Sequence, residues 1–297
     1  MNYELTLAPH DLERFITYYR SFKEQNDDPR ILHVFKTDDF RITVYNSGKT
    51  LFQGKNAFSE YEVWARHFGL EIESIPDETA YQNQYFDKRV IGSDEVGTGD
   101  LFGPIVVCAA YVTPKDYPLL DELRVRDSKT LSDQQIKEIG SKLIENLSYH
   151  VLVLPPEKFN ELTSQGFNMN KIKAYLHNHA IKKMVKQTAQ FDNVIVDEFC
   201  SKENYFSYLA NEDPYQKINF HIKGESIHKA VAVASIIARY KFLLEMDRLS
   251  QETGIVLPKG SGAPADAIAK LIFLQRGKDI FSKIAKLNFK NFERIFN

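Results

Sequence analysis

Residues 89–112 read RVIGSDEVGTGDLFGPIVVCAAYV and contain the clearest structural signal in the chain. We predict one strand over Arg89–Asp94 and a second over Pro104–Val112, because both runs are apolar and the second is rich in Val and Ala. The first strand ends on Asp94, and a second carboxylate, Glu95, and a glycine-rich turn follow it before the second strand. A carboxylate that ends an apolar strand is costly unless solvent, a partner or a metal ion stabilises it. The stretch therefore predicts a sheet with a polar site at one strand end.

The rest of residues 88–297 alternates strands with helices, which predicts an α/β domain. One helix begins after Leu131, where Ser132 and Gln135 have the spacing of a capping box. The chain ends in helices rich in Lys and Arg. The other predicted elements are strands over Tyr149–Leu154, Asn193–Asp197 and Ile218–Ile222 and helices over Asn170–Gln187 and His228–Ser250.

Four carboxylates follow predicted strands: Asp94, Glu95, Asp197 and Glu225. Any one of them alone could cap a helix or meet water. As a set they indicate a site, because several like charges held together need a cation, a proton or basic neighbours. Ligands usually bind at such strand ends in open α/β sheets. Oxygen ligands without His or Cys favour Mg²⁺ or Mn²⁺ over zinc.

Two further segments could contact a phosphate. Gly97 and Gly99 of the GTG turn let a ligand approach the backbone closely, although a tight turn between strands explains them equally well. Ser128 and Lys129 precede a helix and suit a phosphate contact, or form a capped loop with a solvated Lys. No nucleotide-binding glycine motif is present. Acids, backbone donors and Lys together indicate phosphoryl chemistry, in which two metal ions about 4 Å apart can activate water.

Residues 1–73 predict a separate small unit with the order β-α-β-β-β-α. Its third predicted strand, Phe40–Tyr45, alternates apolar and polar side chains, so we expect two helices on one sheet face and an open second face. Residues 74–87 have little periodicity and are predicted to be a linker to the second domain, 88–297.

Composition excludes several classes of protein. The chain has 297 residues and a formal net charge of −2, so nucleic-acid binding would depend on local patches. Two isolated cysteines exclude a disulfide framework and a CxxC metal pair. The sequence contains no signal-peptide pattern and no apolar run long enough for a membrane span, so we expect a cytoplasmic protein with no membrane partner.

The ordered segments IGSDEVGTGDLFGP, RDSKTLSD, VIVDEF and KGESIHKAVAVASIIAR resemble those of the ribonuclease HIII family, a branch of the type 2 ribonucleases H. The segment SGKTLFQGKNA resembles the family's TATA-binding-protein-like N-terminal domain. The resemblance spans essentially the whole chain. It implies a ribonuclease H-like fold with a mixed sheet, and an endonuclease that cleaves the RNA strand of RNA–DNA hybrids to 5′-phosphate and 3′-hydroxyl ends.

The resemblance also implies roles for individual residues. The metal-binding acids would be Asp94, Glu95, Asp197 and Glu225, with Asp94 shared by two Mg²⁺ or Mn²⁺ ions. Gly97, Thr98 and Gly99 would sense the 2′-hydroxyl that separates RNA from DNA. Ser128 and Lys129 would hold the phosphate near the cut, and Lys223 is a further phosphate contact.

Three alternatives remain open. A ribonuclease HII-like enzyme would cut at single embedded ribonucleotides, but that family carries Arg in the glycine turn and Asp as its fourth acid, where this chain has Thr98 and Glu225. A non-catalytic hybrid-binding protein is disfavoured because all four acids are present. A DNA-cutting nuclease of the same superfamily would differ at the 2′-hydroxyl sensor.

The N-terminal unit would bind the hybrid through its open sheet face. Arg41, Thr43 and Tyr45 alternate onto that face, and Lys49 and Lys55 flank the next strand. An ordinary solvated face explains each of these residues about equally well. We expect a monomer, and a second basic track on the C-terminal helices is predicted at Lys283, Lys286 and Lys290.

Overall fold

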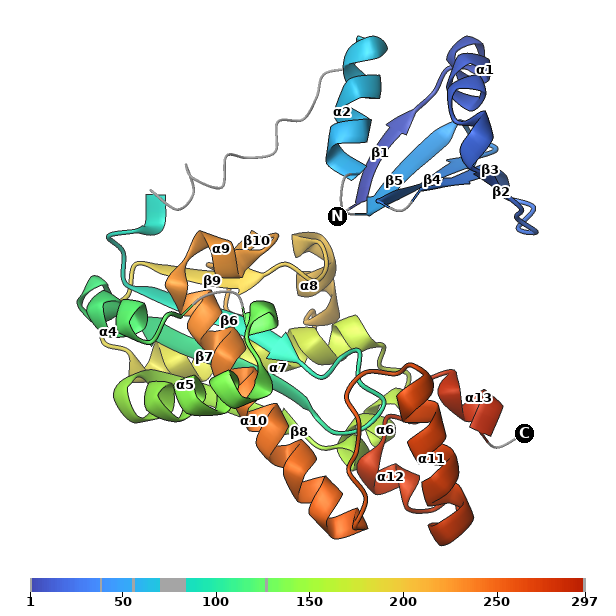
Figure 1. Ribbon diagram of the computed structural model, residues 1–297. Helices are drawn as coiled ribbons and strands as arrows, with labels where there is room; N and C mark the ends of the chain where they lie inside the picture. The colour runs from blue at the N-terminus through green and yellow to red at the C-terminus, as the bar shows by residue number, and fades with distance from the viewer. Residues whose placement is uncertain (1, 38, 55–56, 70–83, 126–127, 296–297) are drawn as a thin grey trace. The chain divides into compact units, whose positions relative to one another are not determined.

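The structure is a computed structural model that describes residues 2–37, 39–54, 57–69, 84–125 and 128–295 (Figure 1). The chain divides into two compact units, Met1–Ile75 and Pro76–Asn297. Residues 74–83 of the expected linker lie outside the described residues, so the predicted linker stays a prediction.

The N-terminal unit is a five-stranded antiparallel sheet with two helices. Its strand order is β1-β5-β4-β3-β2. The expected order is confirmed except for the two-residue edge strand β2, which is too short for a periodicity signal. The elements are β1 (Asn2–Thr6), α1 (Pro9–Tyr18), a 3₁₀ turn (Arg20–Phe22), β2 (Lys23–Glu24), β3 (Ile31–Lys36), β4 (Phe40–Tyr45), β5 (Lys49–Gly54) and α2 (Ala57–His67).

Both helices pack on the same face of this sheet, as predicted (Figure 1). The ring of Phe15 on α1 lies 4.7 Å from that of Trp64 on α2 and 6.0 Å from that of Phe52 on β5. The opposite face differs from expectation at Thr43, which is buried. Thr43 pairs with Val34 on one side and Leu51 on the other, so the larger neighbours on the two flanking strands cover it.

The second unit is built on a five-stranded mixed sheet with the order β10-β9-β6-β7-β8. β6, β7 and β8 pair in antiparallel fashion, whereas β9 and β10 run parallel to β6. This arrangement confirms the predicted mixed α/β class. The strands are β6 (Val90–Val96), β7 (Ile105–Val112), β8 (Ser148–Leu154), β9 (Asn193–Asp197) and β10 (Asn219–His221).

Helices cover both faces of this sheet (Figure 1). The predicted capping box at Ser132 and Gln135 is present at the start of α5. Several short helices escaped sequence analysis because they span too few turns to show a period. The helices are α4 (Tyr117–Glu122), α5 (Asp133–Asn146), α6 (Pro156–Ser164), α7 (Met169–Gln187), α8 (Lys202–Tyr208), α9 (Gly224–Ile227), α10 (Lys229–Thr253), α11 (Ala263–Arg276), α12 (Phe281–Ile284) and α13 (Asn291–Ile295).

The core lies on both sides of the sheet, because successive residues of β7 alternate between its faces. Val106 and Cys108 pack toward α10, whereas Val107 and Ala109 pack toward α7. Helix α10 approaches β6 so closely that a Cβ on Gly92 would lie 2.3 Å from the backbone carbon of Ala230. The small side chain of Ala230 permits this approach. Among the described residues, no helix is long and apolar enough to span a bilayer.

Candidate active site

Asp94 lies near the end of β6 and is almost completely buried. In the parallel pair of β6 with β9, Ser93 is opposite Val196, so Asp94 adjoins the strand end that carries Asp197. The backbone N–H of Glu95 donates to Asp94 Oδ1 at 2.7 Å. Burial raises the pKa of Asp94 well above its usual value, and the charges of Glu95 and Asp197 raise it further. The strand ends therefore hold a carboxylate whose negative charge is opposed by its surroundings.

Glu95 is held by two basic side chains of α7. Its Oε1 lies 2.8 Å from Lys173 Nζ, and its Oε2 lies 2.9 Å from His177 Nε2. Burial alone would raise the pKa of Glu95, but the hydrogen bond from His177 and the charge of Lys173 outweigh it and lower the pKa to about 2. Glu95 is therefore kept ionised, whereas the surroundings of the neighbouring Asp94 disfavour its ionised form.

Lys173 and His177 had no assigned role in the sequence analysis. Both contact Phe199: Lys173 Nζ lies 4.1 Å from the ring centroid, and the His177 ring stacks on it at 5.1 Å. His177 Nδ1 also lies 2.8 Å from Ser93 Oγ on β6. Their spacing of four residues places them on one helix face, which is a visible signal. The sequence does not show which strand that face meets.

Asp197 and Glu225 are brought together by the connection from β10 into α9. The N–H of Gly224 donates to Asp197 Oδ1 at 2.7 Å, and a Cβ on Gly224 would lie 3.3 Å from Asp197 Cα. Glu225 follows in the first turn of α9. Lys223, just before it, adopts the left-handed conformation with φ +55°. Such a conformation is uncommon for a residue other than glycine and is concentrated at functional sites.

The donor chemistry of these acids fits a hard divalent cation, since a cation would relieve the repulsion that raises the pKa of Asp94. The positions of their side chains do not form a complete metal site. Within the described ranges, no group of three or more His, Cys, Asp or Glu side chains is placed to hold a metal ion. One cause is visible at Glu95, whose two carboxylate oxygens contact Lys173 and His177.

The glycine turn after β6 has two different glycines. Gly97 has φ +94°, and a Cβ there would lie 2.2 Å from the carbonyl oxygen of Pro104. Gly99 has no heavy atom within 4 Å of an added Cβ, so its side is open to a ligand. Gly97 is therefore explained by the turn itself, whereas Gly99 is not.

Ser128 is buried at the start of a 3₁₀ turn, Ser128–Thr130, and its Oγ lies 2.7 Å from Ser235 Oγ on α10. Ser235 also forms a hydrogen bond with Asp94. The structure thus connects the Ser128 segment to the acids through one serine. The side chain of Lys129 lies outside the described part of the structure.

The predicted N-terminal contacts are spread over the sheet. Arg41 and Lys49 are exposed, and Tyr45 is half-buried. Lys49 Nζ forms an ion pair with Glu4 at 2.6 Å. Tyr45 and Lys49 both line a pocket of about 630 Å³ together with Arg30. Lys55 lies outside the described residues.

The predicted C-terminal basic track is wrong at Lys286, which is completely buried. Its Nζ donates to the carbonyl oxygen of Gly103 at 2.6 Å. Periodicity cannot distinguish a lysine on a solvated face from one that serves a backbone carbonyl.

Comparison with known proteins agrees with the fold. Residues 91–292 match the family described as Ribonuclease HII, and residues 4–68 match a domain of unknown function (DUF3378). Ribonuclease HIII of Phytoplasma mali is 40% identical over 99% of this chain and 98% of its own. Ribonuclease HIII of Listeria monocytogenes is 39% identical over 95% of this chain and 94% of its own. These matches define the class as a ribonuclease of type 2.

Similar solved structures narrow the assignment within the type 2 ribonucleases. The Mn²⁺ complex of Bst-RNase HIII is 37% identical, covers 100% of this chain and 98% of its own, and has a TM-score of 0.72. Aquifex aeolicus RNase H3 is 26% identical, covers 96% and 99%, and has a TM-score of 0.57. The chain belongs to the ribonuclease HIII family.

Proposed function

We propose that four carboxylates carry out the activity of this chain, the endonucleolytic cleavage of the RNA strand of RNA–DNA hybrids: Asp94, Glu95, Asp197 and Glu225. The observation that supports this most strongly is the raised pKa of Asp94, caused by burial and by the charges of Glu95 and Asp197. Carboxylates with strongly shifted pKa values are concentrated at functional sites. The products would carry 5′-phosphate and 3′-hydroxyl ends.

The four acids would hold one or two divalent cations, Mg²⁺ or Mn²⁺. A bound cation would supply Lewis-acid stabilisation of the charge that develops on the phosphoryl oxygens. Lys173 and His177 keep Glu95 ionised, and the N–H of Gly224 orients Asp197. These contacts fix the charge of Glu95 and the orientation of Asp197 at the strand ends.

The substrate contacts are proposed from the chain's own geometry. Gly99 leaves the backbone of the turn accessible, so Gly97, Thr98 and Gly99 would meet the ribose 2′-hydroxyl. The segment with Ser128 and Lys129 would hold a phosphate beside the acids, to which Ser235 connects it. Lys223, next to Glu225, would contact a second phosphate.

The N-terminal unit, 1–73, would bind the hybrid through Arg41, Tyr45, Lys49 and Lys55. Lys49→Met is then expected to weaken hybrid affinity and to reduce the slope of log affinity against log salt by about one. Arg66→Gln is the matched control, because Arg66 is exposed on helix α2 and pairs with Glu62 on the same helix. Equal salt slopes for the two variants would refute this surface.

The chain would act as a monomer. We place the activity in the cytoplasm, because Cys108 and Cys200 form no disulfide and a reducing compartment suits them.

The assignment of the acids is tested by Asp94→Asn, Asp197→Asn and Glu225→Gln on a labelled hybrid with Mg²⁺ or Mn²⁺. Each is expected to lose at least about a hundredfold in rate. Glu203→Gln is the control, since Glu203 is an exposed acid in the first turn of α8. Full activity in any of the three site variants would remove that residue from the proposal.

A further inference from the structure

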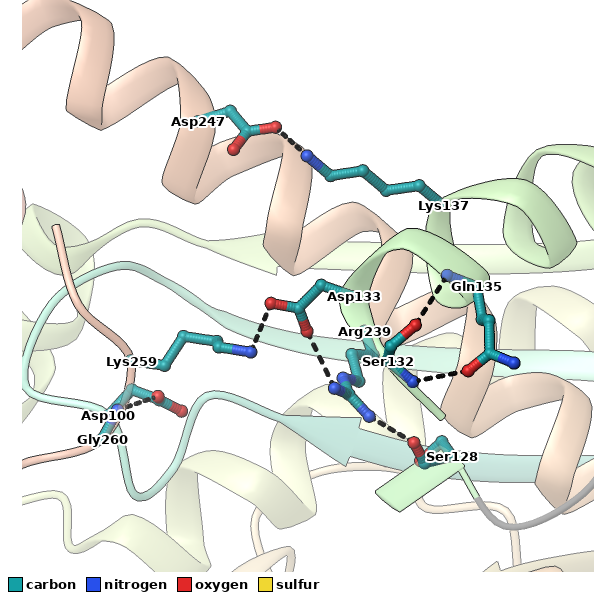
Figure 2. A network of polar contacts seen from close by, with 10 residues as sticks. All are labelled: Asp100, Ser128, Ser132, Asp133, Gln135, Lys137, Arg239, Asp247, Lys259 and Gly260. Atoms are coloured by element: carbon teal, nitrogen blue, oxygen red, sulfur yellow. Dashed lines mark hydrogen bonds and ion pairs between the residues drawn. The ribbon is translucent and has the colours of Figure 1, made fainter. Parts of the chain in front are cut away.

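A chain of polar contacts joins the two segments that are proposed to hold substrate (Figure 2). It begins at the glycine turn, where the N–H of Gly260 donates to Asp100 Oδ1 at 2.5 Å. The N–H of Leu101 donates back to the carbonyl oxygen of Gly260 at 3.0 Å. The segment before α11 is therefore fastened to the end of the turn.

Asp133 carries the connection onward, as Figure 2 shows. Lys259, the neighbour of Gly260, places Nζ 2.5 Å from Asp133 Oδ2. The other oxygen, Oδ1, accepts from Arg239 Nη2 at 2.8 Å. Arg239 Nη1 in turn donates to the backbone carbonyl of Ser128. One carboxylate thus links the loop at the turn to the loop that carries Ser128.

These polar contacts contribute little to the stability of the fold, because two of the side chains that form them are exposed to solvent. The side chains of Asp133 and Lys259 are 39% and 44% exposed, and ion pairs of that kind contribute about 0–1 kcal/mol. The side chain of Arg239 is more buried, with 18% of its surface exposed. These contacts have a small effect on unfolding, but they join the two substrate segments. We therefore expect them to fix the position of one segment relative to the other.

We propose that Asp133 is a positioning residue that sets the spacing between the glycine turn and the Ser128 segment, through Lys259 on one side and Arg239 on the other. The proposal rests on the proposed function, which gives both segments to the substrate. A hybrid must contact the ribose sensor and the phosphate-holding segment at once, so a shift between them weakens binding of the reactive geometry.

A matched control exists on the same pair of helices. Lys137 of α5 pairs with Asp247 of α10 at 2.5 Å, just as Asp133 of α5 pairs with Arg239 of α10 (Figure 2). Among the described residues, Lys137 and Asp247 form no ion pair with either substrate segment. Lys137→Met therefore removes an ion pair between the two helices and leaves the connection intact.

The experiment measures Asp133→Asn, Lys259→Met, their double variant and Lys137→Met. Each protein is tested for hybrid affinity in chelator over a series of salt concentrations, for KM and kcat with Mg²⁺, and for its urea midpoint. We expect Asp133→Asn and Lys259→Met to weaken affinity and raise KM by about three- to tenfold with kcat nearly unchanged. The double variant should be no worse than Asp133→Asn, and Lys137→Met should match the wild type in affinity.

Three results would overturn the proposal. The first is an affinity of Asp133→Asn equal to that of Lys137→Met while both keep the same urea midpoint. The second is a salt slope lowered by about one in Lys259→Met, which would mean that Lys259 contacts a phosphate directly. The third is a wild-type protein that does not bind the hybrid, which would overturn the proposed function itself and is seen before any variant is compared.

Discussion

The ammonium group of Lys173 lies 2.8 Å from Glu95 Oε1, and the two side chains are only 9% and 12% exposed. This buried ion pair sits one residue from Asp94, whose own charge is opposed by burial and by its neighbours. Of these two neighbouring acids, Glu95 has a basic ion-pair partner, whereas the surroundings of Asp94 on balance disfavour its charge.

Removing Lys173 should destabilise the protein more than removing an exposed lysine. Lys173→Met leaves the charge of Glu95 without its ammonium partner, so we expect a loss of about 2–4 kcal/mol in the free energy of unfolding. The double variant Lys173→Met/Glu95→Gln should recover part of that loss, because the uncompensated charge is gone. Urea unfolding in chelator measures the wild type, Lys173→Met, Glu95→Gln and the double variant.

Lys158→Met is the control for this cycle, since Lys158 pairs with Glu161 on the surface at 2.6 Å. Its cost should stay below about 1 kcal/mol. Strictly additive losses in the double variant would show that Lys173 and Glu95 do not act as a pair.

Asp94→Asn should abolish cleavage and stabilise the chain. The charge of Asp94 is opposed by burial and by two other carboxylates, so a neutral amide of the same size should raise the free energy of unfolding by about 1 kcal/mol in chelator. Thermal unfolding without divalent ions gives the comparison.

The opposite sign is expected for Asp192→Asn. The hydrogen bonds from Arg89 lower the pKa of Asp192 to about 2, so its charge is favoured in the folded state and its loss should destabilise. If Asp94→Asn melts below the wild type, the account of an opposed charge at Asp94 is wrong.

The two glycines of the turn should respond differently to alanine. Gly97→Ala places a Cβ 2.2 Å from the Pro104 carbonyl at a positive φ, so we expect a loss of about 2–3 kcal/mol. Gly99→Ala meets nothing within 4 Å and should fold normally, yet it should weaken hybrid cleavage if the substrate approaches there. A fully active Gly99→Ala enzyme would exclude a close approach at that residue.

The stability of the chain should depend on pH through Lys286. Burial lowers the pKa of Lys286 from 10.5 to about 7. Between these values the unfolded chain binds the proton and the folded chain does not, so the free energy of unfolding rises with pH. The slope attributable to Lys286 is at most about 1.4 kcal/mol per pH unit.

Lys286→Met removes that dependence. Relative to this variant, the wild type should gain stability from pH 7 toward pH 10 and show no relative change below pH 7. Urea unfolding of both proteins at a series of pH values measures the difference. Parallel curves across the whole range would contradict the buried, deprotonated amine.

Much of the architecture could be predicted because local signals agree with tertiary demands. The apolar runs on both sides of Asp94 form β6 and β7, and the capping box at Ser132 begins α5. The helix predicted over His228–Ser250 forms α10, whose Ala230 meets Gly92. In these elements the periodicity of the sequence and the burial of the fold coincide.

The residues that sequence analysis missed depend on long-range contacts. Lys173 and His177 face Glu95 across 78 and 82 residues, and Lys286 reaches Gly103 across 183. In the sequence these three residues look like ordinary solvent-exposed polar residues. Only the packing of α7 on β6, and of the C-terminal segment on the loop after β6, gives these basic groups their partners.

The most direct test of the account uses three labelled duplexes of one sequence: an RNA–DNA hybrid, a DNA duplex with one embedded ribonucleotide, and DNA alone. Each is incubated with Mg²⁺, with Mn²⁺ and with chelator, beside Asp94→Asn. The account predicts metal-dependent cleavage of the hybrid, weak cleavage at the single ribonucleotide, none of DNA, and none by Asp94→Asn. Efficient cleavage at the single ribonucleotide, or intact hybrid binding with no cleavage, would contradict it.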